Sequence, residues 1–235
     1  MIFFSIDLPY HSSSLVEKHF LRLTKETPLD LLQQTTWRIL RTYPDGSRQD
    51  SSNQNPVFAW NFGIQMAALN FQTDDETMAL NHGKFLDNGG CGYVRKPDYL
   101  IRAREIPFNP NNALHYKVDQ CQLLKITIIS GQFLSRSKSK SSDIPDPYVN
   151  VSIHGLPCDQ QQAKTSVVKN NGFNPQWQET FFFRVYFPQM ALIYFSVYDS
   201  DPLNSDDRIA FFTLPCTMIQ TGNRSISNSD CHRSN

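Results

Sequence analysis

The second half of the chain runs Asp143-Ile-Pro-Asp-Pro-Tyr-Val-Asn-Val-Ser-Ile-His154, and Leu192-Ile-Tyr-Phe-Ser-Val-Tyr-Asp-Ser-Asp201 follows it. Each stretch joins an acidic cluster to a run that alternates like a half-buried β-strand. Acidic loops at one end of a β-sandwich can meet in space, and their oxygen atoms suit Ca²⁺. Asp, Asn, Ser and Pro are also ordinary turn formers, so either cluster alone has a second interpretation. An EF-hand is excluded, because a loop counted from Asp199 lacks the Gly and the terminal Glu.

Size and composition limit the classes of protein. The 235 residues allow one large domain or two ordinary ones, and 40% hydrophobic with 19% charged residues is a globular composition. The net charge is zero, so no global field attracts nucleic acid, which we exclude as a partner. The sequence contains no apolar stretch of about 18 residues, so no transmembrane helix is predicted. The five scattered cysteines indicate reduced thiols and a cytoplasmic location.

Residues 1–103 mix helix and strand patterns. We predict a helical segment over 15–32 that is interrupted at Pro28, a strand over 37–43 and a helix over 77–85. The nearly continuous apolar run over 64–71 predicts a strand that is buried on both faces, and another strand is expected after Asn88. Alternation of strands and helices predicts an α/β arrangement.

The remainder of the chain shows strand patterns alone. Strands are predicted over 123–130, 148–154, 180–187 and 193–199, with the turn spacing of a β-sandwich. We therefore predict an all-β domain over 122–220, a linker over 104–121 and a polar, disordered tail over 221–235.

Four long motifs resemble a known family. Three are similar to the Y half of eukaryotic phosphoinositide-specific phospholipase C, and the fourth is similar to the C2 domain that follows it there. These motifs are Arg41-Thr-Tyr-Pro-Asp-Gly-Ser-Arg-Gln-Asp-Ser-Ser-Asn53, Trp60-Asn-Phe-Gly-Ile-Gln-Met-Ala-Ala-Leu-Asn-Phe-Gln-Thr73, Asn88-Gly-Gly-Cys-Gly-Tyr-Val-Arg-Lys-Pro97 and Asn170-Asn-Gly-Phe-Asn-Pro-Gln-Trp177. The resemblance implies the C-terminal half of a TIM-type barrel followed by a C-terminally incomplete C2 β-sandwich.

The resemblance also implies substrate contacts at the ends of barrel strands, the usual place for a barrel's active site. Ser14 and Arg41 match residues that contact the inositol phosphates, and Tyr43 matches a tyrosine that stacks against the inositol ring. From the residues alone, Arg41 is better interpreted as a solvated charge at a strand end, and the resemblance reverses that preference. The guanidinium suits a phosphate because it can bind two oxygens at once.

The C2 half carries the implied Ca²⁺ ligands. The carbonyl of Ile144 and the side chains of Asp146, Asn170, Asp199, Asp201 and Asp207 match the family's set. Ala210 stands where the family usually has Gly, which could strain a turn near Asp207. Asn170 could instead serve the turn of its Asn-Asn-Gly sequence.

The family's catalytic histidines and catalytic Ca²⁺ ligands belong to the X half of the barrel, which the resemblance does not include. None of the six histidines lies in those motifs, so we assign no catalytic residue and expect this polypeptide alone to be inactive. We interpret the chain as part of a Ca²⁺-dependent phosphodiesterase that cleaves phosphatidylinositol 4,5-bisphosphate to diacylglycerol and inositol trisphosphate in signal transduction. Such an enzyme is cytoplasmic, binds membranes peripherally and needs the X half as a partner. The alternative is a non-catalytic Ca²⁺- and phospholipid-binding C2 protein or a regulatory fragment.

Overall fold

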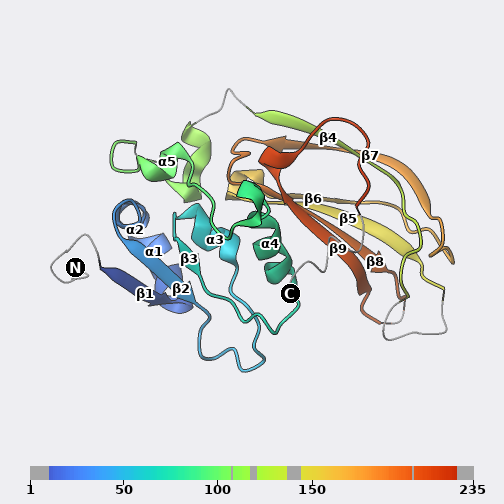
Figure 1. Cartoon of the computed structure of the whole chain (residues 1–235), viewed down its shortest axis with the longest axis horizontal. Coiled ribbons are helices and arrows are strands. Elements are labelled where there is room, and N and C mark those ends of the chain that lie inside the picture. Colours follow the sequence, from blue (N-terminus) through green and yellow to red (C-terminus); the bar gives the residue numbers. More distant parts are fainter. Residues whose placement is uncertain (1–10, 107, 117–120, 137–143, 203, 227–235) are drawn as a thin grey trace. The chain divides into compact units, whose positions relative to one another are not determined.

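Two units make up the fold in the computed structural model shown in Figure 1. Unit 1 comprises Met1–Val118 with Gly155–Cys158, and unit 2 comprises Asp119–His154 with Asp159–Asn235. The structure describes residues 11–106, 108–116, 121–136, 144–202 and 204–226. Asp143 and the last nine residues of the expected disordered tail, 227–235, lie outside the described residues.

Unit 1 is built on a parallel three-stranded sheet. Strand β2 lies in the middle, with β1 and β3 on either side, and both pairings are parallel. The strands are β1 (Ser12–Val16), β2 (Ile39–Tyr43) and β3 (Met66–Ala67), and the helices are α1 (Glu17–Glu26), α2 (Pro28–Gln34), α3 (Pro56–Asn61), α4 (Glu76–Lys84) and α5 (Asp98–Ile101). Two 3₁₀ segments, η1 (Asp87–Gly90) and η2 (Pro110–Tyr116), complete the unit.

Local sequence signals explain where these helices begin and end. Thr27 ends α1, and Pro28 occupies the first turn of α2, where a missing N–H costs nothing. The side chain of Asn55 accepts a hydrogen bond from Val57 N at the start of α3. The Asp75 side chain caps α4 in the same way by accepting from Met78 N. The helical segment interrupted at Pro28 and the helix predicted over 77–85 are confirmed.

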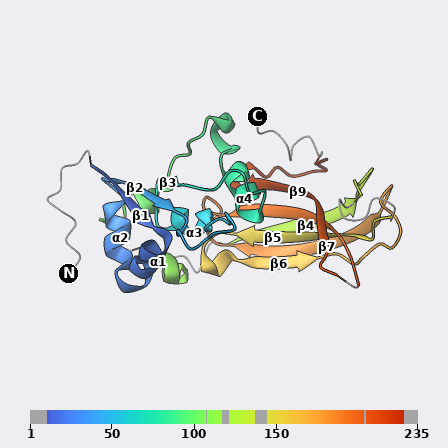
Figure 2. The same ribbon diagram turned by 90° about the horizontal axis from the view of Figure 1, so that it is seen from below.

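Helices cover one face of the sheet and leave the other open. Leu15 and Leu40 point from β1 and β2 into a hydrophobic core. Helix α1 contributes Phe20 and Leu23 to this core, α2 contributes Leu31, and Phe62 follows α3. In Figure 2, α1 and α2 lie on one side of β1–β3. On the opposite face Ile39 and Met66 are each 52% exposed. An α/β arrangement is thus present, but the described strands do not close into a barrel.

Two predicted strands of this unit are wrong in detail. The run over 64–71 contains only the two-residue strand β3, and Phe71 at its end is exposed. Its apolar residues are not buried on both faces, because no further strand or layer covers the open face among the described residues. The strand predicted after Asn88 is absent. The backbone there forms η1 and then an irregular segment, because Asn88, Gly89, Gly90 and Gly92 all have positive φ.

Unit 2 consists of two antiparallel sheets. Strand β4 pairs with β7, and the second sheet has the order β6-β5-β8-β9. The strands are β4 (Gln122–Ser130), β5 (Pro147–His154), β6 (Gln161–Lys164), β7 (Gln176–Val185), β8 (Leu192–Asp199) and β9 (Asp207–Pro215), followed by the 3₁₀ turn η4 (Cys216–Met218). The 3₁₀ turn η3 (Pro157–Asp159) lies where the chain passes from unit 1 back to unit 2. The four predicted strands are confirmed as β4, β5, β7 and β8, whereas β6 and β9 were not predicted.

A single core joins the two sheets of unit 2. Alternate residues of β5 and β8, such as Val151 and Ile193, pack with Phe183 and Val185 of β7. Trp177 closes this core near the start of β7, and its Nε1–H donates to Ser166 O at 3.1 Å. Strand β9 escaped prediction because its residues are nearly all half-buried, which leaves no clear alternation.

We expect Ile193→Ala to lower the free energy of unfolding by about 2–5 kcal/mol, because the deletion leaves a cavity at a fully buried position. Urea unfolding of the full chain, followed by near-UV circular dichroism, measures the change. Ile129→Ala is the matched control, since Ile129 is exposed on β4. Equal losses in the two variants would contradict the core assignment.

Candidate functional site

The three predicted substrate contacts lie on the open face of the sheet. Ser14 and Arg41 are paired Cα partners in β1 and β2, and Tyr43 follows two residues later on the same face of β2. The Arg41 guanidinium carbon lies 5.2 Å from the centre of the Tyr43 ring. Thr42 points to the opposite, buried face. The fold therefore gathers Ser14, Arg41 and Tyr43 in one place, where a planar cation and an aromatic ring are both accessible.

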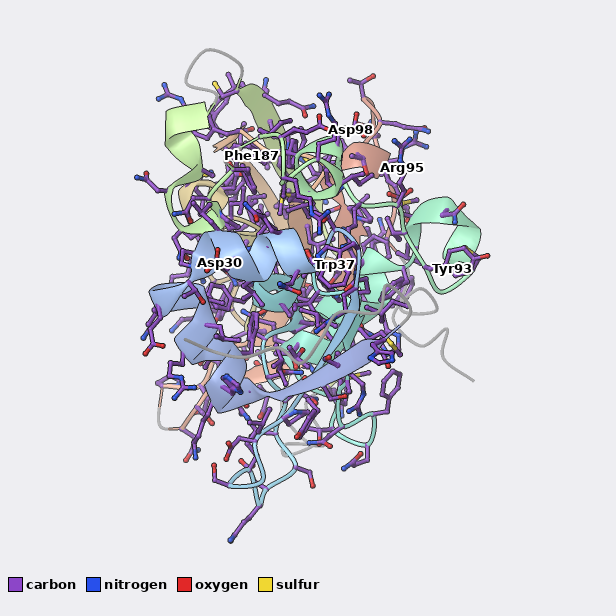
Figure 3. The ribbon with its side chains drawn as sticks, turned by 90° about the vertical axis from the view of Figure 1, so that its left-hand side faces the viewer. Asp30, Trp37, Tyr93, Arg95, Asp98 and Phe187 are labelled. Carbon is purple, nitrogen blue, oxygen red and sulfur yellow. The ribbon has the colours of Figure 1, made fainter. Side chains whose placement is uncertain are left out.

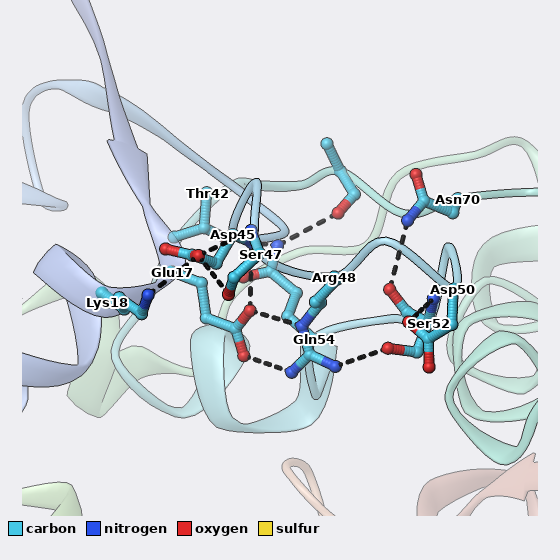
Figure 4. Close-up of polar contacts among 11 residues, drawn as sticks. Glu17, Lys18, Thr42, Asp45, Ser47, Arg48, Asp50, Ser52, Gln54 and Asn70 are labelled. Atoms are coloured by element: carbon cyan, nitrogen blue, oxygen red, sulfur yellow. Dashed lines mark hydrogen bonds and ion pairs between the residues drawn. The ribbon is translucent and has the colours of Figure 1, made fainter.

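An ion-pair network ties together the ends of β1 and β2 (Figure 4). Glu17, the residue after β1, accepts two hydrogen bonds from Arg48, from Nε at 2.7 Å and from Nη2 at 2.6 Å. The same carboxylate accepts from Asp45 N at 3.2 Å. Lys18 forms a second ion pair with Asp45 at 3.1 Å. We call these four residues, Glu17, Lys18, Asp45 and Arg48, the charge clasp.

The clasp shifts the ionisation of its carboxyl groups. The hydrogen bond from Arg48 holds the pKa of Glu17 below its usual value, although burial opposes this. Hydrogen bonds from Ser47, with a further one from Lys18, lower the pKa of Asp45 to about 2. The Glu17 and Arg48 side chains are only 12% and 29% exposed, so water screens this pair far less than a surface ion pair.

A different ion pair in unit 1 is fully solvated. Arg95 and Asp98 lie 3.0 Å apart at the start of α5, and their side chains are 80% and 73% exposed. Both residues are labelled in Figure 3, together with Tyr93, which projects outwards from the preceding segment. Such a pair contributes little to stability. The Arg95–Asp98 pair is therefore a solvent-exposed comparison for the more buried Glu17–Arg48 pair.

In unit 2 the acidic loops meet at one end of the sandwich. Asp199 Oδ1 accepts a hydrogen bond from Asp146 N at 2.8 Å, and Asp146 Oδ1 accepts from Asn170 N at 2.6 Å. Asn170 has φ of 52°, which supports its role in the Asn-Asn-Gly turn. The chain of hydrogen bonds therefore links three of the six predicted Ca²⁺ ligands.

The remaining predicted ligands are placed differently. Asp207 is the directly paired partner of Asp199 across β8 and β9, an arrangement that brings two carboxylates close together. Asp201 belongs to its own loop, where its N–H donates to Asp206 Oδ1 and its Oδ2 accepts from Asn204. Ile144 is exposed beside Asp146. Among the described residues, no three His, Cys, Asp or Glu side chains gather as a metal site.

The anticipated strain at Ala210 is wrong. Ala210 lies within β9 opposite Val197, and its φ is not positive. A bulge in the pairing beside Val197 and Tyr198 absorbs the irregularity instead. Asp207 is the first residue of β9, and the bulge lies between Arg208 and Ala210.

Close packing fixes the Asn170 loop against the Asp146 loop. A Cβ atom on Gly172 would lie 2.9 Å from Pro145 Cδ, so no side chain fits there. Asn171 N also donates to Pro145 O at 3.0 Å. Next to this contact, Phe173 and Phe133 meet edge to face at 4.7 Å while remaining 69% and 73% exposed.

Sequence reasoning missed several of these residues. Glu17 and Arg48 are 31 positions apart, and no spacing rule joins them. Asp206, which accepts from the Tyr148 hydroxyl at 2.7 Å, was passed over in favour of its neighbour Asp207. The aromatic pair did leave a signal, since Phe173 is an apolar residue within an Asn-Gly-Phe-Asn-Pro turn sequence. No helix in the described part of the chain is long and apolar enough to cross a membrane.

Comparison with known proteins gives matches over both units. The family model described as "Phosphatidylinositol-specific phospholipase C, Y domain" matches residues 5–99, and the C2 domain model matches residues 122–229. Human 1-phosphatidylinositol 4,5-bisphosphate phosphodiesterase delta-4 is 44% identical over 92% of the chain, and the Xenopus laevis protein of the same name is 42% identical over 92%. The chain spans 28% and 29% of these two relatives. The crystal structure of PLC21 from L. pealei aligns with a TM-score of 0.76 and 34% identity, over 88% of this chain and 26% of that one.

Glu17→Gln should flatten the pH dependence of stability. A carboxyl whose pKa is lowered in the folded state stabilises the fold above its unfolded pKa, near 4.5, and loses that contribution as the pH falls through the folded pKa. We expect the wild-type chain to exceed the variant by about 1–3 kcal/mol at pH 7, and the difference to shrink below pH 4.5.

Urea unfolding at pH 7 and at pH 3.5 provides this measurement. Glu105→Gln is the control, because Glu105 forms an exposed ion pair with Arg102. Asp45 titrates in all three proteins, so its contribution largely cancels. Parallel pH profiles for wild type and Glu17→Gln would contradict the assigned origin of the pKa shift.

Proposed function

The chain belongs to the phosphatidylinositol-specific phospholipase C family, with a Y domain followed by a C2 domain, and from this we propose that it contributes half of a phosphodiesterase active site. The proposed substrate is phosphatidylinositol 4,5-bisphosphate, which the whole enzyme cleaves to diacylglycerol and inositol trisphosphate. One observation carries the proposal: Ser14, Arg41 and Tyr43 share the open face of a parallel sheet.

Each of these residues has a chemical role in the proposal. The Arg41 guanidinium binds ring phosphates, with the Ser14 hydroxyl as a further hydrogen-bond partner. The Tyr43 ring packs against the apolar face of the inositol ring. Acid–base histidines and the catalytic Ca²⁺ would come from the X half, because this chain has no residues in those motifs.

The proposed partner is the X half of the barrel. Ile39 and Met66 support this, since they lie on the same open face as Arg41 and are half exposed. Apolar surface in the middle of a parallel sheet is normally covered. Completion of the barrel would bury it and would enclose the substrate contacts.

The proposed role of unit 2 is Ca²⁺-dependent attachment to the membrane at its cytoplasmic face. Asp199 and Asp207 are directly paired across β8 and β9, which brings two carboxyl groups of the predicted ligand set into one place. Oxygen ligands from Ile144, Asp146, Asn170, Asp199, Asp201 and Asp207 suit Ca²⁺. Because Asp201 bonds within its own loop, its participation requires that loop to rearrange. The second candidate, a non-catalytic Ca²⁺- and lipid-binding protein, would use this unit alone.

We expect co-expression with the X half of a related enzyme to yield a soluble complex that hydrolyses phosphatidylinositol 4,5-bisphosphate, whereas the 235-residue polypeptide alone does not. In the complex, Arg41→Ala should slow cleavage of the bisphosphate by about ten- to a hundredfold, because a charge-assisted hydrogen bond to a ring phosphate is lost. Cleavage of unphosphorylated phosphatidylinositol should change much less.

Two further variants test whether the complex with the X half forms through the open face of the sheet. Ile39→Asp should prevent the complex from forming, whereas Leu29→Asp, at an exposed position of α2, should not. Equal losses on both lipids in Arg41→Ala would show a purely structural role for Arg41. A complex that assembles without turnover would favour the non-catalytic candidate.

Millimolar Ca²⁺ should raise the melting temperature of unit 2, because a ligand that binds only the folded state stabilises it by about 2.7 kcal/mol at a hundredfold excess over Kd. Asp199→Asn with Asp201→Asn should remove most of the shift, and Asp30→Asn on α2 should leave it intact. Differential scanning calorimetry of the chain in chelator and in Ca²⁺ tests this. Identical melting in both buffers would overturn the site.

A further inference from the structure

The charge clasp joins the two strands that carry the proposed substrate contacts. Glu17 directly follows β1, which holds Ser14, and Arg48 lies in the segment that follows β2, which holds Arg41 and Tyr43. The Cα partner of Tyr43 across the sheet is Val16, the residue before Glu17. Glu17 therefore sits one residue beyond the last paired position of the sheet, and Arg48 reaches it from the turn that follows Tyr43.

The hydrogen bonds leave the clasp little freedom. Arg48 uses Nε and Nη2 for the two oxygens of Glu17, and its Nη1 donates to Ser52 Oγ at 3.0 Å. A forked guanidinium–carboxylate contact fixes orientation as well as distance. Because Glu17 also accepts from Asp45 N, one carboxylate holds two points of the turn that starts after Tyr43.

The Tyr43 side chain is 36% exposed and lies on the open face, where its described ring contact is with Arg41. The turn that the clasp holds begins directly after Tyr43, so a change in that turn would move the backbone that carries the ring. The forked contact between Arg48 and Glu17 fixes the orientation of the two groups as well as their distance.

We propose that the Glu17–Arg48 pair is a positioning device for headgroup recognition: it holds the turn after β2 so that Arg41 and Tyr43 keep the spacing that inositol ring phosphates require. The inference rests on the proposed function. It assigns Glu17 and Arg48 no contact with the substrate. Their effect is on selectivity between phosphorylated and unphosphorylated inositol headgroups.

The test uses the complex of this chain with the X half. Arg48→Met should lower the ratio of initial rates on phosphatidylinositol 4,5-bisphosphate and on phosphatidylinositol by about tenfold. Arg48→Lys keeps the charge but loses the fork, so the ratio should remain low even where melting temperature recovers. Arg95→Met removes an exposed ion pair of the same unit and should leave the ratio unchanged.

Hydrogen exchange provides a second readout that does not depend on turnover. In Arg48→Met, amides from Tyr43 to Gln49 should exchange at least tenfold faster than in wild type, with β4–β9 unaffected. Equal rate losses on both lipids, full recovery of the ratio in Arg48→Lys, or unchanged exchange at Tyr43 would each overturn the proposal. A wild-type complex without activity would instead count against the proposed function, and the exchange result would still decide the role of the clasp.

Discussion

The parallel sheet of unit 1 packs one face against helices of the same unit and leaves the other face exposed among the described residues. In unit 1, α1–α3 cover Leu15 and Leu40, while Arg41 and Ile39 alternate onto the other face. The accessibility of the open face follows from that arrangement. Arg41 and Tyr43 are accessible because the described strands do not close into a barrel, and the exposed apolar residues Ile39 and Met66 lie on the same face.

The carboxylates of the two candidate sites have different neighbours. In unit 1 each carboxylate of the clasp has a cation beside it, and the network links the ends of β1 and β2. In unit 2 Asp199 and Asp207 are directly paired across β8 and β9, and hydrogen bonds from backbone N–H groups reach Asp146 and Asp199. The clasp thus joins opposite charges, whereas the acidic loops of unit 2 bring predicted ligands of the same charge together.

How far the sequence could predict this molecule depended on the range of the interactions. Patterns within ten residues identified the break at Pro28 and the strands β5 and β8, because alternation and proline act locally. The strand over 64–71 failed because burial requires neighbours, and apolar composition cannot say whether they are there. The long motifs located Arg41 and Tyr43. Glu17 and Arg48 could not be joined by any local rule, since their contact exists only when β1 and β2 pair.

The contact between Gly172 and Pro145 has a consequence for sequence change in this protein. Every replacement of a glycine adds at least one carbon atom, and at position 172 that atom would collide with a proline ring that has no rotamer to give way. The exposed neighbours Phe173 and Asn174 are not constrained by this contact. A position with no side chain thus becomes one of the least replaceable in the loop, because it sets how closely the Asn170 loop approaches the Asp146 loop.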